Sequence, residues 1–216
     1  MTKSSDGQQV GISGAGFSAA VSSVVPRILG IGGTTRGGSI SERALRYALS
    51  CVQGQGAETE LLAGTDLVLP LYSPISAGRS DKSTALIAAL RRADGIILSS
   101  PGYHGCISGL LKNALDYVED LRDDPQPYLE GRAVGLIACA IGTQACGTTL
   151  MTMRTVVHAL RGWPTPLGVT IKSSAASPSG SSRIDAGVGN QLAVLALQVL
   201  GFARMREQIG GASSTV

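Results

Sequence analysis

The fold is decided by the stretch Ile28-Leu29-Gly30-Ile31-Gly32-Gly33-Thr34-Thr35-Arg36-Gly37-Gly38-Ser39-Ile40-Ser41. Its first four residues are a short apolar run typical of a buried strand, and the glycines that follow predict a tight loop. From Ser39 to Gln53 the apolar side chains recur at the spacing of one helix face, which predicts an amphipathic helix. A strand, a glycine-rich loop and a helix in this order begin a parallel α/β unit.

The same succession of a short apolar strand and a longer amphipathic helix repeats along the chain. Further strands are expected at 59–63, 94–100, 133–140 and 166–171, and further helices at 82–92, 107–121, 147–160 and 185–204. Helices between short strands imply right-handed crossovers and a parallel sheet covered on both faces. Five such strands predict a flavodoxin-like three-layer α/β sandwich with strand order 2-1-3-4-5, in which ligands bind beyond the carboxyl ends of the strands.

A single domain is predicted for residues 26–208, because 216 residues are close to the size of one domain and no boundary interrupts the repeated plan. Residues 1–25 are rich in Ser, Gly and Ala, and serines interrupt their apolar run from Phe17 to Val25. A secretory signal needs a basic start and a continuous apolar segment, so this segment is interpreted as a flexible N-terminal arm, with a partner-binding arm as the alternative. Residues 209–216 are expected to form a flexible C-terminal tail.

The composition argues against several classes of protein. A net charge of +3 without a long run of Lys and Arg argues against nucleic-acid binding. No stretch approaches about 18 uninterrupted apolar residues, so no membrane-spanning segment is expected. The four cysteines form no C-x-x-C pair and the chain has two histidines, which argues against a metal site, a disulfide framework and a dithiol redox motif. A cytoplasmic location is therefore expected.

The glycine-rich loop after the first strand is suited to bind an anion. Its free N–H groups and the positive end of the helix dipole would face the ligand. Thr34, Ser39 and Ser41 add hydroxyl donors, and Arg36 adds a guanidinium that matches phosphate oxygens. A terminal phosphate suits these donors, but Ser39 and Ser41 are also compatible with helix capping, and Arg36 with a solvated surface charge. The loop is neither a complete G-x-G-x-x-G fingerprint nor a Walker loop.

A second motif follows the third predicted strand: Ser99-Ser100-Pro101-Gly102-Tyr103-His104-Gly105-Cys106-Ile107-Ser108-Gly109-Leu110-Leu111-Lys112-Asn113-Ala114-Leu115-Asp116. It resembles the pattern S-P-x-Y-[N/H]-G-x-x-x-G-x-L-K-N-A-L-D of the NADPH-dependent FMN reductase family of flavodoxin-like proteins. The phosphate loop of that family, G-S-x-R-x-x-S-x-N, is matched at Gly33, Thr34, Arg36, Ser39 and Ser41, with Thr34 in place of Ser and Ser41 in place of Asn. The resemblance covers roughly Arg27 to Met205.

The resemblance implies a bound FMN at the rim of the sheet. The residues that would hold its phosphate are Thr34, Arg36, Ser39 and Ser41, and those that would wrap its isoalloxazine ring are Pro101, Tyr103, His104 and Gly105. The family also places the segment after the fourth strand beside the ring, which adds Gly142, Thr143 and Gln144. The alternative for that segment is a glycine turn that caps a helix, and the alternative for Tyr103 is packing against a neighbouring subunit.

Other residues of the second motif are left outside the expected site. Cys106 is interpreted as a small buried thiol rather than a redox-active group. Lys112, Asn113 and Asp116 are expected to form bonds between helix and loop, or a subunit contact. Hydride transfer to a flavin needs no side-chain acid, so His104 is expected to position the ring.

The resemblance also implies an activity: NADPH or NADH would pass a hydride to flavin N5, and a small-molecule electron acceptor would take the electrons in a second, ping-pong step. The open alternatives for the acceptor are free FMN, a quinone, an azo compound and a metal ion. If the protein is a flavin reductase, the expected partner is a monooxygenase that receives the reduced flavin. Family members are commonly homodimers or homotetramers, so a homo-oligomer is expected. A non-catalytic electron carrier and a flavin-free Rossmann-type binding protein are the competing interpretations, although carriers are typically strongly acidic and this chain is not.

Overall fold

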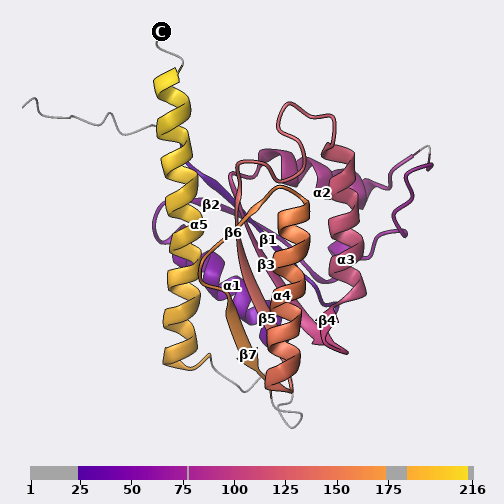
Figure 1. Cartoon of the computed structure of the whole chain (residues 1–216), viewed down its shortest axis with the longest axis vertical. Helices are drawn as coiled ribbons and strands as arrows, with labels where there is room; N and C mark the ends of the chain where they lie inside the picture. The colour runs from indigo at the N-terminus through magenta and orange to yellow at the C-terminus, as the bar shows by residue number, and fades with distance from the viewer. Residues whose placement is uncertain (1–23, 77, 174–183, 214–216) are drawn as a thin grey trace, which may run out of the picture.

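The computed structural model describes residues 24–76, 78–173 and 184–213, which form three layers (Figure 1). A twisted sheet is the middle layer. Helices α1 (Ile40–Gln53) and α5 (Ala186–Ser213) pack on one face, and α2 (Asp81–Arg92), α3 (Gly109–Asp116) and α4 (Thr143–Ala159) pack on the other. The predicted flavodoxin-like α/β sandwich is confirmed.

The sheet has the order β2-β1-β3-β5-β6. Its strands are β1 (Arg27–Gly32), β2 (Glu58–Leu62), β3 (Gly95–Tyr103), β5 (Ala133–Ala140), β6 (Trp163–Pro164) and β7 (Val169–Lys172). All of these neighbours pair in parallel, and β6 and β7 both pair with β5. In chain order this approximates the predicted 2-1-3-4-5 succession, with the fifth strand broken in two and a short strand, β4 (Cys106–Ile107), added antiparallel to β3.

The break in the fifth strand follows from its sequence. Pro164 and Pro166 have no N–H to donate to a ladder, so a continuous strand from 163 to 172 is disfavoured. The backbone between β6 and β7 is bound by side chains instead: Arg154 donates to the carbonyl oxygens of Thr165 and Pro166 at 3.2 and 3.0 Å, and the Leu167 N–H donates to Gln198 Oε1 at 3.2 Å.

Alternate residues of each strand face opposite cores. Ile28, Ile97 and Ile137 point to the layer of α1 and α5, whereas Leu29 and Leu98 belong to the core under α2, α3 and α4. Every residue of β5 is buried because the sheet is covered on both sides, which explains the unbroken apolar run that the sequence shows there.

Two glycines let α5 lie close against the sheet. A Cβ at Gly95 on β3 would lie 2.5 Å from Val199 Cγ1, and a Cβ at Gly135 on β5 would lie 2.5 Å from Leu195 Cδ2. These distances are shorter than any ordinary contact, so larger residues at either position would push the helix away.

Several element bounds differ from the expectation. The helix expected at 107–121 ends at Asp116 and continues as a 3₁₀ helix, η2 (Tyr117–Leu121), while α4 begins at Thr143 instead of Gly147. A further 3₁₀ helix, η1 (Gly64–Leu67), follows β2. Residues 1–23, which hold nearly all of the expected N-terminal arm, lie outside the described residues.

Helix α5 is longer than expected. It ends at Ser213 rather than Arg204, because residues 205–208 are good helix formers and no proline follows them. Much of the segment expected as a C-terminal tail is therefore helical. By length and composition the part from Ala186 to Ile209 would suffice to cross a bilayer, with a mean hydropathy of 1.5. One side of it, however, packs on the sheet through Leu195 and Val199, as in the core helix of a globular domain.

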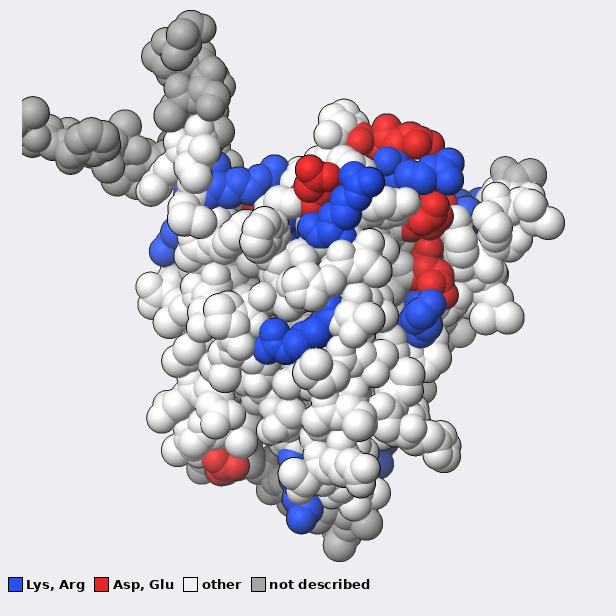
Figure 2. Space-filling model, viewed as in Figure 1, with Lys and Arg blue, Asp and Glu red and all other residues white. Residues whose placement is uncertain are grey.

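Charged side chains gather at one end of the face that Figure 2 shows. This upper end holds the amino ends of the strands, and the ion pairs Arg91–Asp124 and Arg161–Glu130 lie there. The lower end, where α4 begins, carries few charges in this view.

Candidate functional site

The first loop, residues 33–39, joins β1 to α1 and is fixed on two sides. The Gly33 N–H donates to the Ser99 carbonyl oxygen on β3 at 2.7 Å, and the Gly64 N–H donates to the Thr34 carbonyl oxygen at 3.2 Å. A Cβ at Gly33 would lie 2.7 Å from the Oγ of Ser108, the N-cap of α3, and 3.2 Å from the Ser99 carbonyl oxygen. Glycine is therefore required for the loop to lie against β3 and α3.

Several donors of this loop have no partner. The N–H groups of Thr35, Gly37 and Ser41 meet no acceptor within the described residues. Arg36 is exposed, and among the arginines that the structure describes it is the one whose guanidinium makes no hydrogen bond or ion pair. A Cβ at Gly37 or Gly38 would meet open space. Free N–H groups, a free cation and room at a helix N-terminus are the requirements of an anion site.

The hydroxyl groups predicted for this site are engaged within the loop. Ser39 is the N-cap of α1, and its Oγ accepts from the Glu42 N–H at 3.2 Å. Ser41 is 2% exposed, and its Oγ lies 3.1 Å from Ser39 Oγ. Thr34 is buried too, and its Oγ1 accepts from the Arg36 N–H at 3.1 Å. The capping alternative describes Ser39 in this structure, and the exposed donors are Arg36 and the N–H groups of Thr35 and Gly37.

The second loop is a β-hairpin made by β3 and β4, which the sequence did not predict. Its two turn residues, His104 and Gly105, have φ of 54° and 79°. Positive φ at both positions is the type I′ turn, whose twist matches that of paired strands. Tyr103, with 57% of its surface exposed, and His104, also exposed, lie at the tip, while Pro101 is half-buried at its base.

The third segment is the start of α4. Gly142 is its N-cap, and Thr143 and Gln144 belong to its first turn; all three are exposed. The hairpin packs against this helix: Thr149 Oγ1 donates to the Cys106 carbonyl oxygen at 3.4 Å, and a Cβ at Gly105 would lie 3.2 Å from Thr148 Oγ1. The hairpin and the N-terminus of α4 therefore form one wall at the carboxyl end of the sheet.

The structure thus brings all three predicted segments to the same rim. The β1 loop is bonded to β3 through Ser99, and the register that pairs Pro101 with Cys139 places the hairpin beside the end of β5. The N-termini of α1 and α4 both open onto this rim, and the exposed Tyr103 and Ile141 give it apolar surface.

Two of the cysteines at or near the rim, Cys106 and Cys139, differ in exposure. Cys106 is exposed, so its interpretation as a buried thiol is wrong: in β4 the inward position is taken by Ile107. Cys139 is 3% exposed, and burial raises the pKa of its thiol to about 12. Cys139 therefore stays protonated at neutral pH. No group of three or more His, Cys, Asp or Glu side chains among the described residues is arranged to hold a metal ion.

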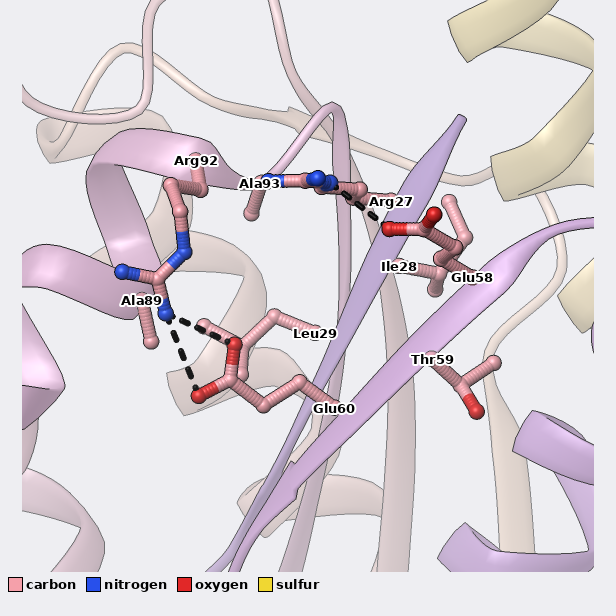
Figure 3. A pocket seen from close by; sticks show the side chains of 9 residues that line it. All are labelled: Arg27, Ile28, Leu29, Glu58, Thr59, Glu60, Ala89, Arg92 and Ala93. Carbon is pink, nitrogen blue, oxygen red and sulfur yellow. Dashed lines mark hydrogen bonds and ion pairs between the residues drawn. The ribbon is translucent and has the colours of Figure 1, made fainter. Parts of the chain in front are cut away.

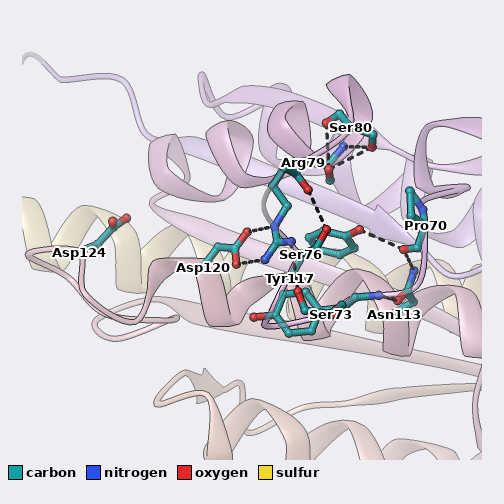
Figure 4. A network of polar contacts seen from close by, with 12 residues as sticks. Pro70, Ser73, Ser76, Arg79, Ser80, Asn113, Tyr117, Asp120 and Asp124 are labelled. Carbon is teal, nitrogen blue, oxygen red and sulfur yellow. Dashed lines mark hydrogen bonds and ion pairs between the residues drawn. The ribbon is translucent and has the colours of Figure 1, made fainter.

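The long loop between η1 and α2 is anchored to α3 and η2 (Figure 4). Asn113 on α3 accepts from the Tyr72 N–H at 2.9 Å and donates to the Pro70 carbonyl oxygen at 2.9 Å. Arg79 donates to both carboxylate oxygens of Asp120 at 2.6 and 2.8 Å, and its guanidinium lies 5.0 Å from the centre of the Tyr72 ring. The expected bond between helix and loop is therefore observed for Asn113.

A cavity of 320 Å³ lies between α2, β1 and β2 (Figure 3). It is lined by the first residues of β1 and β2, at the end of the sheet opposite the rim. Its charged residues neutralise one another: Arg27 pairs with Glu58 at 2.8 Å and Arg92 with Glu60 at 3.1 Å. The cavity is separate from the three loops.

The layers, strand order and rim define a flavodoxin-like α/β protein. The sequence profile of the NADPH-dependent FMN reductase family matches residues 26–177, about 70% of the chain. The chain belongs to this family.

Relatives with curated descriptions agree with this assignment. An NAD(P)H-dependent FMN reductase of Pseudomonas aeruginosa is 29% identical over 119 residues, which are 54% of this chain and 60% of that protein. An FMN-dependent NADPH-azoreductase of Staphylococcus haemolyticus is 34% identical over 82 residues, which are 38% of this chain and 40% of that protein. The chain thus matches between two fifths and three fifths of the length of these relatives.

Solved structures share the fold. The protein RosB with a bound flavin-phosphate intermediate has a TM-score of 0.68 at 17% identity, covering 84% of this chain and 80% of that chain. An NADH:FMN oxidoreductase has a TM-score of 0.63 at 22% identity, covering 83% and 89%. FerB, an NAD(P)H:acceptor oxidoreductase of Paracoccus denitrificans, has a TM-score of 0.58 at 18% identity, covering 85% and 98%.

Proposed function

We propose that this chain binds FMN at the rim and oxidises NADPH or NADH for a small-molecule electron acceptor. The observation that carries the proposal is the unpaired guanidinium of Arg36 beside free N–H groups at the N-terminus of α1. A terminal phosphate is the ligand that such a group of donors suits. Family membership makes FMN the phosphate-bearing ligand.

The residues of the chain bind and orient, while FMN when bound supplies the hydride chemistry. Arg36 and the N-terminus of α1 hold the phosphate, with Thr34, Ser39 and Ser41 shaping the loop behind it. The wall that the hairpin from Pro101 to Gly105 forms with the N-terminus of α4, at Gly142, Thr143 and Gln144, supports the ring. Donor groups at a hairpin turn and a helix N-terminus favour the negative charge that reduction creates.

The acceptor is proposed from the open rim and from the relatives. Tyr103 and Ile141 offer exposed apolar surface on which a flat molecule can stack, so free FMN, a quinone and an azo compound are the candidates. One relative described as an azoreductase favours the last of these. A homodimer or homotetramer, a monooxygenase as recipient of reduced flavin, and a cytoplasmic location complete the proposal.

The proposal is tested by titrating the purified protein with FMN and then measuring NADPH and NADH oxidation with FMN, a quinone, an azo dye and ferricyanide. We expect a yellow complex and turnover with at least one acceptor. FMN binding without any turnover would favour the electron carrier, and failure to bind FMN would contradict the proposal.

A single substitution tests the phosphate site directly. Arg36→Ala should weaken FMN binding by more than about tenfold, because a charge-assisted contact is lost. Arg204→Ala is the control, since that arginine lies on α5 and donates to the Gln55 carbonyl oxygen. Unchanged affinity in Arg36→Ala would remove Arg36 from the site.

A further inference from the structure

Arg43 is a second arginine whose side chain reaches the phosphate loop. It lies one turn into α1, and its side chain folds back toward the helix N-terminus, where Nη1 donates to the Gly38 carbonyl oxygen at 2.9 Å. Gly38 has a positive φ of 69°, so this bond holds the bend at which the loop backbone is left-handed. Glu42 fixes the same residue from the other side, accepting from the Gly38 N–H at 3.0 Å.

The guanidinium of Arg43 is incompletely satisfied. Its Nε is the one buried side-chain nitrogen or oxygen atom without a hydrogen-bond partner in the described part of the chain. A buried donor without an acceptor costs free energy of folding, and the cost is greater for a charged group. An acceptor or a negative charge supplied from outside the chain would offset that cost.

The charges around the loop leave Arg43 without an acidic partner. Glu42 is the one acidic residue between Gly33 and Arg46, and its carboxylate is taken by Arg46 at 2.7 Å and by the Gly38 N–H. Three arginines and one glutamate give this segment a formal charge of +2. A phosphate monoester carries a charge of about −1.5 to −2 at neutral pH, so it would neutralise the segment.

We propose that Arg43 determines the preference of this site for a phosphorylated flavin over riboflavin. It is a positioning residue: it holds the Gly38 bend so that the free N–H groups stay accessible, and its positive charge joins that of Arg36 in the field acting on the phosphate. The inference rests on the proposed function, and it names a residue that lies outside the G-S-x-R-x-x-S-x-N pattern.

The test compares two flavins that differ only in the phosphate. Dissociation constants of FMN and riboflavin are measured by fluorescence quenching on flavin-free wild type, Arg43→Gln and Arg43→Lys. We expect Arg43→Gln to weaken FMN binding about tenfold and riboflavin binding less than twofold. Arg43→Lys should recover part of the FMN affinity because it keeps the charge. Arg92→Gln is the charge-matched control at the opposite end of the sheet.

Each outcome decides the inference. An equal loss for both flavins in Arg43→Gln would show that Arg43 only stabilises the fold, and unchanged FMN binding would show no role for it; either result overturns the proposal. The melting temperatures of the flavin-free variants identify a folding defect. If Arg43→Gln has such a defect, the ratio of the FMN and riboflavin dissociation constants of Arg43→Lys decides between the outcomes. Loss of the preference for FMN in Arg43→Lys, which keeps the charge, contradicts the proposal. A wild-type chain that binds neither flavin overturns the proposed function as well.

Discussion

His104 has the most constrained backbone among the residues of the site. Its φ of 54° lies in the left-handed region, which asparagine and histidine enter more readily than other residues with a Cβ. The turn explains why the family pattern alternates between these two residue types at this position. Backbone geometry, rather than proton transfer, is therefore sufficient reason for a histidine here.

His104→Asn should keep the hairpin and the activity. We expect an unchanged or higher melting temperature and NAD(P)H oxidation within about threefold of wild type. His104→Val should lose about 1–2 kcal/mol of unfolding free energy, because a β-branched residue is disfavoured at positive φ. Thermal unfolding and steady-state rates check both. A large loss of turnover in a stable His104→Asn protein would assign the imidazole a chemical role instead.

Cysteine reactivity should separate Cys106 from Cys139. Alkylation requires an accessible thiolate, and Cys106 is exposed whereas Cys139 is buried with a pKa raised to about 12. Brief treatment of the native protein with iodoacetamide, followed by peptide mass spectrometry, should modify Cys106 and leave Cys139 intact. Comparable labelling of both would mean that the end of β5 opens readily. Bound FMN should slow the labelling of Cys106.

For individual residues, the sequence predicted which residue types lie at the rim better than it predicted which contacts they make. Gly33 and Arg36 were predicted at the rim from their place after a strand, and they lie there. The contact of Arg43 with the loop was missed, because periodicity describes where a Cβ points and not where a long side chain folds back. The exposure of Cys106 depended on a hairpin that the spacing of apolar residues does not reveal.

Among the elements, the loop from Val68 to Arg79 is held by the ion pair of Arg79 with Asp120 as well as by Asn113. Arg79 and Asp120 are each about one-fifth exposed, and the hydrogen bonds from Arg79 hold the pKa of the Asp120 carboxyl below its ordinary value. A carboxylate with a lowered pKa stabilises the fold above its unfolded pKa of about 4, and this stabilisation is lost as the pH falls through the folded pKa.

Asp120→Asn should therefore destabilise the protein by about 1–3 kcal/mol at pH 7 and by less at pH 3. Urea unfolding of wild type and variant at both pH values measures the difference. Asp123→Asn is the control, because Asp123 is 86% exposed in its pair with Arg122 and should change little at either pH. A loss that is equally large at pH 3 would contradict the role of the Asp120 charge.

The elements that were predicted correctly are those with one continuous pattern. The bounds of β5 were predicted without error because its apolar run is unbroken, and α2 began one residue before its predicted start. The start of α4 was missed because Gly142 and Gly147 together look like a loop, although only Gly142 lies outside the helix. The fifth strand was expected at 166–171, whereas β7 begins only at Val169 and the short strand β6 before Pro166 was not predicted.

For the molecule as a whole, the close contact between α5 and the sheet contributes to stability. Gly135→Val should cost about 1–3 kcal/mol of unfolding free energy, because the new side chain overlaps Leu195 and Val199. Gly201→Ala is the matched control on α5: its Cβ meets open space, so it should add about 0.5–1 kcal/mol by favouring the helix. Guanidinium unfolding of both variants measures the two changes. A tolerated Gly135→Val would mean that α5 can move away from the sheet without penalty.

The interruption between β6 and β7 has a consequence for solubility. An exposed sheet edge is a template on which a strand of another molecule can add and start a fibril. Here the edge is two short pieces, and the carbonyl groups between them are already occupied by Arg154. A foreign strand would find no continuous row of free donors and acceptors on this side of the protein, so this edge is a poor template for strand addition.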